Sequence, residues 1–324
     1  MEIKLMGVLY NVLLHNAQTI FDSASPQAEK IKGLTNGFIW ASSAVMLLVV
    51  VLSVYIPVKF RAKTGTAEPK QTGGNRKLEM LMIGIPMLLV IGFFFWSLSV
   101  MSAVLPARDN RKPDVIITGH QWWWQADYPA AKVTAANEIH LPVGRQLLLQ
   151  LNAADVIHDW WVPALGGKMD MIPGVTNYLW VTINKPGIYE GACSEFCGQQ
   201  HAWMRIRVVA QQPVDYKRWL AANALAGKAP TDSMAKAGQA LFVNASCSSC
   251  HSINGSGAKG LQGPDLTHFG SRTTMLTGLM ANNPENLYRW LSDPQKVKPG
   301  ANMPRFIFGR DSLRALTAYL SHLK

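Results

Sequence analysis

The chain has 324 residues, of which 48% are hydrophobic and 16% are charged, and its formal net charge is +11. The charged fraction is low for a soluble protein, and the length allows two domains in addition to membrane segments. A positive charge of this size suggests nucleic acid or an anionic membrane surface, but no segment concentrates it into a dense basic arm. We therefore expect solvated charged faces and no nucleic-acid binding.

Residues 1–36 contain a modest apolar run, Leu5–Leu14, which Asn11 interrupts. The run is weak for the apolar part of a signal peptide. We expect residues 1–36 to form an uncleaved segment outside the cytoplasm, and a cleaved signal peptide is the alternative.

Two charge-free runs follow, Gly37–Ile56 and Met80–Ala107. Each is long enough to provide the roughly 20 residues that cross a hydrocarbon core. Two such runs close together predict a transmembrane helical hairpin over residues 37–106, rather than two core helices of a large soluble protein. Pro86 in the second run is compatible with this because neighbouring helices can satisfy the freed backbone groups.

The loop between the two runs is basic. Before Glu79 it carries six basic side chains against the single acid Glu68; the basic residues are Lys59, Arg61, Lys63, Lys70, Arg76 and Lys77. Positive charge marks the cytoplasmic side of a membrane, so both termini are expected outside the cytoplasm. Neither run contains a histidine for haem or an acid for a proton path, so a partner would have to supply any pump.

Residues 107–226 read as β structure. Short runs rich in β-formers are separated by glycines and prolines, at Val115–Thr118, Gln146–Leu151, Tyr178–Ile183 and Met204–Val209. This pattern predicts an all-β sandwich. A short amphipathic helix is expected after it, at Pro213–Leu225.

The segment Cys193–Met204, CSEFCGQQHAWM, brings two thiols, a carboxylate, an imidazole and a thioether into one short stretch. A β fold could bring His158 to the same place. Thiolate, imidazole and thioether together describe an electron-transfer copper site, and two cysteines can bridge a pair of copper ions. The two cysteines and His201 alone fit a disulfide or a structural zinc site equally well, but neither of these uses Met204 or His158.

This order and spacing resemble subunit II of the haem-copper cytochrome c oxidases, which carries the binuclear CuA centre. The resemblance implies a cupredoxin-like Greek-key sandwich with the metal loops at one end. By position, the implied copper ligands are Cys193 and Cys197 as bridging thiolates, His158 and His201 as terminal ligands, and Met204 and the main-chain carbonyl of Glu195 as weak ligands. It also implies that the Glu195 side chain binds a magnesium ion shared with subunit I.

The resemblance extends to two further positions. Consecutive tryptophans are usually core residues or interfacial anchors, but the family has an aromatic cluster at Gly119–Tyr128, usually Trp-Tyr-Trp, whose first residue receives electrons. Trp122 matches that residue, whereas Trp123 departs from the common pattern. Glu79 precedes Pro86 at the spacing of the family's acid at the entrance of a proton channel in subunit I, although an acid here also suits a helix N-terminus.

A second cofactor-binding motif follows a linker, which we expect at residues 227–232. The motif CSSCH provides Cys247 and Cys250 for thioether bonds to the haem vinyl groups and His251 for the iron. The alternative, a thioredoxin-like motif, would need a βαβ pattern that is missing here. All four cysteines lie in ligand-like motifs, so we expect no structural disulfide.

The other face of the iron needs a ligand, and His/Met ligation raises the potential of an electron carrier. The candidates are Met234, Met275, Met280, Met303, His268 and His322. Met303, in GANMPR, resembles the methionine-proline loop of the cytochromes c. Pro264, in GPDL, resembles the proline whose carbonyl accepts the second N–H of the haem histidine.

Residues 233–324 otherwise read as helical. Ser233, Asn283 with Pro284, and Asp311 are expected to start the helices. Leucines recur at helical spacing in the last helix. The pattern predicts a small all-α domain, and the resemblance implies a class I cytochrome c fused to the C-terminus of a subunit II.

The resemblance implies a two-pass subunit of a bacterial inner-membrane cytochrome c oxidase, with the copper and haem domains on the periplasmic or external face. Its expected cofactors are CuA, covalent haem c and the shared magnesium. Its expected partners are oxidase subunits I and III, membrane lipid, and a soluble or membrane-bound cytochrome donor or an upstream respiratory complex. Electrons would pass from haem c to CuA and on to subunit I, which reduces dioxygen with proton translocation.

Two other functions remain open at this point. One is the electron-input subunit of a nitric oxide reductase. The other is a membrane-tethered module that binds copper or relays thiols during assembly of another enzyme, but this would have no need of haem. A quinol oxidase subunit is disfavoured because such relatives have typically lost the copper ligands that this chain keeps.

Overall fold

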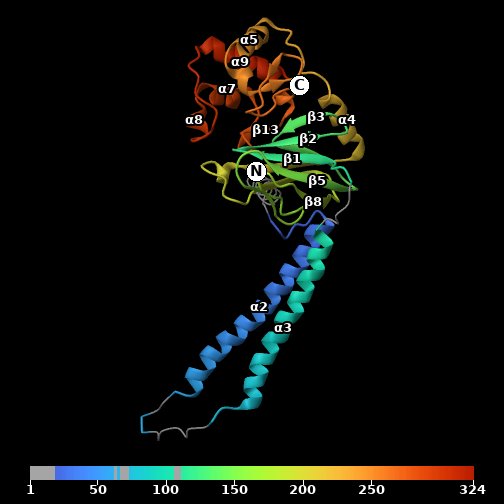
Figure 1. Cartoon of the computed structure of the whole chain (residues 1–324). Coiled ribbons are helices and arrows are strands. Elements are labelled where there is room, and N and C mark those ends of the chain that lie inside the picture. Colours follow the sequence, from blue (N-terminus) through green and yellow to red (C-terminus); the bar gives the residue numbers. More distant parts are fainter. Residues whose placement is uncertain (1–18, 62–63, 66–72, 106–110) are drawn as a thin grey trace, which may run out of the picture. The chain divides into compact units, whose positions relative to one another are not determined.

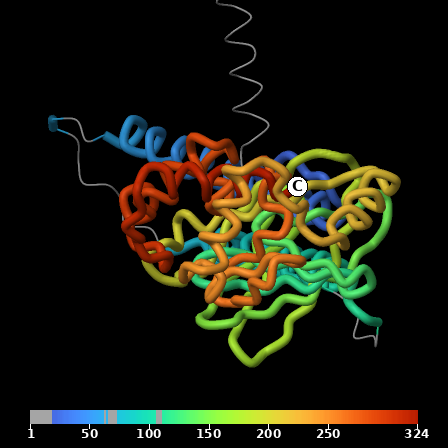
Figure 2. Tube along the Cα trace, turned by 90° about the horizontal axis from the view of Figure 1, so that it is seen from above, coloured from blue at the N-terminus to red at the C-terminus, as the bar shows by residue number. Residues whose placement is uncertain are grey.

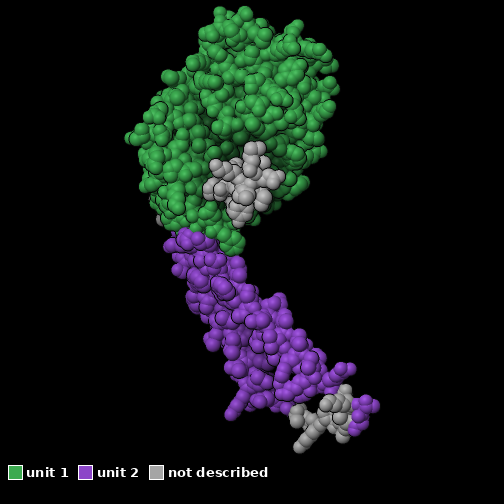
Figure 3. Space-filling model, turned by 180° about the vertical axis from the view of Figure 1, so that it is seen from behind, with its two compact units in different colours: residues 1–28, 106–324 green, residues 29–105 purple. Residues whose placement is uncertain are grey.

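The computed structural model describes residues 19–61, 64–65, 73–105 and 111–324. The chain separates into two compact units, one of residues 29–105 and the other of residues 1–28 with 106–324 (Figure 3). The apolar run Leu5–Leu14 and three charged residues of the basic loop, Lys63, Glu68 and Lys70, lie outside the described residues.

The smaller unit contains two long helices, α2 (Pro26–Lys59) and α3 (Arg76–Val104). They contain the charge-free runs, and helix α2 begins well before Gly37. Along both helices the apolar side chains are exposed, with Trp40 at 76%. Both helices are therefore long and apolar enough to cross a membrane, as expected for the hairpin.

Aromatic side chains join the two helices. The rings of Phe38 and Phe93 stack with their centroids 4.1 Å apart. Gly37 leaves room for Trp96, because a Cβ at Gly37 would lie 2.7 Å from Cη2 of that ring. Small residues at such contacts let helix backbones approach closely. The Asn75 side chain caps α3 by accepting from the backbone N–H groups of its first turn.

The β region is a sandwich of two five-stranded sheets, with strand orders β3-β2-β1-β5-β8 and β4-β10-β9-β6-β7 (Figure 1). Two pairs, β1 with β5 and β10 with β4, are parallel, and the other pairs of the sandwich are antiparallel. The strands are β1 (Val115–His120), β2 (Trp123–Tyr128), β3 (Val133–Ala136), β4 (Glu138–Pro142), β5 (Gln146–Ala153), β6 (His158–Trp161), β7 (Met169–Met171), β8 (Asn177–Thr182), β9 (Gly187–Cys193) and β10 (Arg205–Gln211).

Each of the four β-rich runs of the sequence forms a strand. In β10, the alternation places Ile206 and Val208 in the core and leaves Arg205 exposed. The core also holds Trp124, which is fully buried and meets Trp160 edge to face at 5.6 Å between the centroids. The structure thus confirms the all-β sandwich.

The N-terminal end of α2 belongs to the same unit as the sandwich. The Ser25 hydroxyl donates to the Leu165 carbonyl at 2.8 Å, and the Ala24 N–H donates to the Ala164 carbonyl at the same distance. Ser25 Oγ in turn accepts from the Ala28 N–H, as an N-cap does. Residues 24–28 are therefore tied to the sandwich by hydrogen bonds.

The C-terminal region is helical, and Figures 1 and 2 show its orange-to-red chain beside the green strands of the sandwich. The helices after the sandwich are α4 (Pro213–Asn223), α5 (Ser233–Asn244), α6 (Cys247–Cys250), α7 (Pro284–Ser292), α8 (Pro294–Val297) and α9 (Arg310–His322). Two short hairpins, β11 (Ser252–Ile253) with β12 (Ala258–Lys259) and β13 (Thr274–Met275) with β14 (Met280–Ala281), and the 3-10 turn η2 (Phe269–Ser271) lie among them. A further 3-10 turn, η1 (His201–Trp203), lies within the sandwich, between β9 and β10. Helix α5 packs against α9, where a Cβ at Gly238 would overlap the Ala315 backbone. Phe242 meets Tyr319 edge to face beside this contact.

Two of the three expected helix starts differ. Asp232, and not Ser233, caps α5, because its carboxylate accepts from the Ala235 N–H at 2.8 Å and so places Ser233 inside the helix. Helix α9 begins at Arg310, so Asp311 lies in the first turn and its side chain does not cap. Asn283 does cap α7, with Pro284 directly after it.

Candidate metal and haem sites

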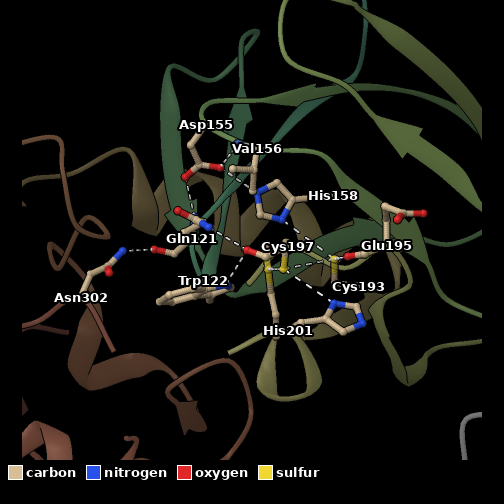
Figure 4. A network of polar contacts seen from close by, with 11 residues as sticks. Gln121, Trp122, Asp155, Val156, His158, Cys193, Glu195, Cys197, His201 and Asn302 are labelled. Atoms are coloured by element: carbon tan, nitrogen blue, oxygen red, sulfur yellow. Dashed lines mark hydrogen bonds and ion pairs between the residues drawn. The ribbon is translucent and has the colours of Figure 1, made fainter. Parts of the chain in front are cut away.

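Two loops at one end of the sandwich bring the expected copper ligands together (Figure 4). His158 begins β6 and Cys193 ends β9, and these strands are neighbours in one sheet. The loop after β9 then adds Cys197, His201 and Met204. The two cysteine Sγ atoms are 3.8 Å apart and are not bonded.

The remaining donors surround the two sulfurs. His158 Nδ1 lies 3.9 Å from the Cys193 sulfur, and His201 Nδ1 lies 3.7 Å from the Cys197 sulfur. The Met204 sulfur is 3.8 Å from that of Cys197, and the Glu195 carbonyl oxygen is 3.2 Å from that of Cys193. Soft sulfur donors with two imidazoles are the ligands that copper prefers. A fully buried thioether beside the thiols is not needed by zinc, so the donor set fits copper better.

Glycines make room for this arrangement. Gly198 has a φ of +116°, which favours glycine, and a Cβ there would lie 2.9 Å from the Trp122 ring. A Cβ at Gly119 on β1 would lie 2.9 Å from the ring of His158. The close approach of β1 to the metal loops therefore depends on both glycines.

Asp155 orients the first histidine. Its carboxylate lies 2.8 Å from Nε2 of the fully buried His158, which leaves Nδ1 facing Cys193. Burial lowers the pKa of His158, but its contacts with Cys193 and Asp155 outweigh burial and the net pKa is raised. A carboxylate behind a ligating histidine fixes the ring and raises its basicity. Asp155 was not among the residues predicted from the sequence, although its position three residues before a ligand histidine is a local signal for this contact.

The two thiols share one hydrogen bond. That contact with Cys197, together with His158, lowers the pKa of Cys193, and the same contact raises the pKa of Cys197. One thiol therefore ionises readily while the other retains its proton. Binding of metal ions to both sulfurs would displace that proton, because metal ligation requires thiolates.

The three tryptophans have different surroundings. Trp122 donates its indole N–H to the Cys197 carbonyl at 3.0 Å, and the Gln121 side-chain amide donates to the same oxygen at 2.7 Å. Trp123 stacks on His120 and also lines the cavity described below. Trp124 lies in the core. Of the three, Trp122 is the one in hydrogen-bond contact with the metal loop.

The remaining expected residues lie apart from the sulfurs. The Glu195 side chain is exposed and its carboxylate points away from them (Figure 4). Glu79 is in the first turn of α3 and is exposed, in the other unit of the chain.

A cavity of about 380 Å³ opens in the C-terminal domain. Its lining is mainly apolar, and Cys247, Cys250, His251 and Met303 all face it. The His251 Nδ1 lies 2.8 Å from the Pro264 carbonyl, which leaves Nε2 for a metal. A Cβ at the adjacent Gly263 would lie 2.6 Å from the His251 ring.

The cavity fits a haem attached to these residues. Burial lowers the pKa of His251, so its imidazole is neutral and able to bind iron near neutral pH. Two thiols beside the cavity mouth suit thioether attachment. Of the other candidates for the sixth ligand, His268 and His322 face the main-chain carbonyls of Leu225 and Ala229.

Two methionines remain as candidates for the sixth ligand, because Met275 and Met303 both line the cavity. Met275 is 3% exposed and belongs to the buried core cluster of the domain, together with Leu266 and Leu287. Met303 lies in an irregular loop that can present its thioether without disturbing the core.

Comparison with known proteins agrees with this geometry. Residues 14–100 match the family model "Cytochrome C oxidase subunit II, transmembrane domain", residues 130–211 match its periplasmic domain, and residues 235–324 match "Cytochrome c". Cytochrome c oxidase subunit 2 of Alkalihalophilus pseudofirmus is 36% identical over 94% of this chain and 91% of its own length. The chain belongs to the cytochrome c oxidase subunit II family.

Other relatives are consistent with this. Cytochrome c oxidase subunit 2 of Bacillus subtilis is 30% identical over 85% of the chain and 83% of the relative. The crystal structure of the periplasmic domain of subunit II of cytochrome oxidase from Bradyrhizobium japonicum matches at 33% identity, covering 35% of this chain and 95% of that domain, with a TM-score of 0.34. The subunit therefore has two membrane-spanning helices, a copper-binding sandwich and a cytochrome c domain, and it is part of a haem-copper oxidase complex.

We predict that Cys197→Ser abolishes the electron paramagnetic resonance signature of one electron shared by two coppers, because a serine hydroxyl is a poor bridge between copper ions. Met204→Leu should retain both coppers and change only their potential, because a thioether is a weak ligand. A shared-electron signal that survives in Cys197→Ser would contradict the bridging assignment.

A buried acid, Asp159, lies beside the copper site and is paired with an exposed acid, Asp170. Asp159 is 3% exposed on β6 and faces Asp170 on β7. Burial, followed by the hydrogen bond and charge of Asp170, raises the pKa of Asp159 to about 7. The folded protein thus holds a proton that an exposed aspartate would release near pH 4.

This pair predicts a pH dependence of stability. Because the folded-state pKa is raised, the stability contributed by Asp159 is fully present below about pH 4 and is lost as the pH rises to about 7. Asp159→Asn should therefore raise the melting temperature more at about pH 8 than at about pH 5, and Asp170→Asn should weaken the same dependence. Melting curves of the copper-loaded chain at both pH values measure this. The same difference in melting temperature between parent and Asp159→Asn at the two pH values would contradict it.

Proposed function

We propose that this subunit is the electron-input subunit of a respiratory terminal oxidase, with electrons entering at haem c, continuing to the copper site and leaving to subunit I. The observation that carries the proposal is the presence, in one compact unit, of a converged set of soft copper donors and a cavity lined by a CSSCH motif. Two such sites in series suit electron transfer, not the binding of a substrate.

The copper site is built to exchange electrons. Cys193 and Cys197 would hold the copper ions together with His158 and His201, and copper bound there would supply one-electron transfer. The chain fills the strong positions with two thiolates and two imidazoles, whereas a catalytic metal keeps a position open. Cys193, Cys197 and His158 are buried, so the protein also excludes water and restrains the ligands.

The haem site is proposed to use Cys247 and Cys250 for attachment, and His251 and Met303 would hold the iron. Pro264 holds the His251 ring by accepting from Nδ1. Such a contact sets the tautomer and orientation of the ligand. These residues belong to the cytochrome c domain, whose charge of +5 comes from 10 basic and 5 acidic side chains in residues 231–324.

The remaining roles concern partners. Trp122 is proposed as the electron entry residue because it donates to the Cys197 carbonyl. The exposed Glu195 carboxylate is proposed to share a magnesium ion with subunit I, and Glu79 to lie at the entrance of its proton channel. With the copper and haem domains outside the cytoplasm, subunit III and lipid would complete the complex. A basic cytochrome domain suits an acidic donor cytochrome or upstream complex.

The experiment that tests this function is gas consumption by the affinity-isolated native complex, supplied with an artificial electron donor. We expect rapid, cyanide-sensitive dioxygen uptake during which haem c turns over. Preferential turnover of nitric oxide would leave the metal sites in place but assign the complex to nitric oxide reduction. A chain isolated with copper but without haem would instead indicate an assembly module.

A further inference from the structure

One buried acid of the sandwich is bound by the cytochrome c domain. Glu138 begins β4 and is 4% exposed. Its carboxylate accepts from the backbone N–H groups of Thr273 and Thr274, at 3.1 and 2.9 Å. The hydroxyl groups of the same two threonines also donate to it, at 2.5 and 2.9 Å.

The charge of this acid makes these contacts significant. A buried carboxylate is strongly unfavourable unless hydrogen-bond donors or an opposite charge compensate it. On its own domain Glu138 has Arg207, whose Nε is 3.5 Å away, but Arg207 also pairs with Glu190 at 2.9 Å. The four donors from Thr273 and Thr274 supply the rest, and such charge-assisted hydrogen bonds are roughly twice as strong as neutral ones.

Further contacts continue along the same boundary. The Thr277 hydroxyl donates to the Trp203 carbonyl at 2.7 Å, in the turn that carries His201. The Gln200 side-chain amide donates to the Pro299 carbonyl. The Asn302 side-chain amide donates to the Gln121 carbonyl at 2.8 Å (Figure 4).

We propose that Glu138 is the docking residue that holds the cytochrome c domain on the copper domain, with residues 273–277 as the segment that it binds. The docked arrangement contributes to the wall of the haem cavity, because Trp122, Trp123 and Asn137 of the copper domain line it together with cytochrome residues. Asn137 directly precedes Glu138, so the docking acid adjoins the wall of the cavity.

Docking also completes a connection between the two metal loops. Asn302, next to Met303, donates to Gln121, and the Gln121 side chain donates to the carbonyl of the copper ligand Cys197. This consequence rests on the proposed function. In the proposed function, one electron lost by the ferrous haem would be gained by the copper pair, and no proton or group would be transferred. The connection exists only while the two domains are in contact.

The test uses the full-length chain in its native complex, loaded with copper and haem. Glu138→Ala should increase amide hydrogen exchange in residues 273–277, because the acceptor of the Thr273 and Thr274 N–H groups is removed. It should also slow light-triggered electron transfer from haem c to copper severalfold, without changing the haem absorption or the copper signal. Glu138→Gln, which keeps one acceptor oxygen, should lie between parent and Ala variant.

The matched control is Glu190→Gln, which removes the other acid of Arg207 but keeps the threonine donors on Glu138, and it should leave exchange at 273–277 unchanged. If Glu138→Ala does not fold, Thr273→Val with Thr274→Val removes two donors from the other side and should have the same effect. Unchanged exchange at residues 273–277 in Glu138→Ala, or in the variant with both Thr273→Val and Thr274→Val, would overturn the proposal. Because this readout does not depend on the final electron acceptor, it is separate from the test of dioxygen or nitric oxide turnover.

Discussion

Two buried sulfur atoms, those of Cys193 and Cys197, lie 3.8 Å apart without being bonded, and much of the copper domain holds them in place. Without a bound metal, two thiols this close would oxidise to a disulfide or, once both were ionised, would repel each other. The β6–β9 pairing supplies His158, Asp155 fixes its ring, and Gly198 allows the loop to turn beside Trp122. Each element restricts the freedom of the donors before a metal binds, so the ligands need little rearrangement on binding.

The same constraint determines how the cytochrome c domain can contribute. Electron transfer between two sites needs them to be close and held in a fixed geometry. A linker alone would provide only a high local concentration. The contacts at Glu138 and Gln121 also provide a defined orientation, because they order the boundary between the domains. A buried acid at such a boundary favours one arrangement over others, since undocking would leave Glu138 with Arg207 but without its four threonine donors.

Much of this could be predicted from the sequence where the information is local. Cys193–Met204 and Cys247–His251 each place their chemistry in one short stretch, so their residue types and spacing indicate a metal site and a haem attachment site, and the family resemblance implies the individual ligand roles. The charge-free runs and the alternation around Ile206 and Val208 likewise reveal helices and a strand. The expected caps at Ser233 and Asp311 were wrong because Asp232 caps α5 in place of Ser233, and because α9 begins at Arg310, which places Asp311 inside the helix.

Other features could not be predicted because they depend on contacts between distant segments. Gln121 reaches the copper loop only after β1, β6 and β9 come together in the sandwich, because its partner Cys197 lies 76 residues further along the chain. Glu138 appears in the sequence as one more acid before a strand, and its partners lie 135 and 136 residues further along the chain. No periodicity or local motif signals such a pairing, so it required the structure.

The most direct test of the central account is the metal content and the copper spectrum of the unmodified full-length chain. The account predicts two copper ions and one covalent haem per chain, with an electron paramagnetic resonance spectrum in which one electron interacts equally with two copper nuclei. A single copper ion, zinc in its place, or a chain without haem would contradict it.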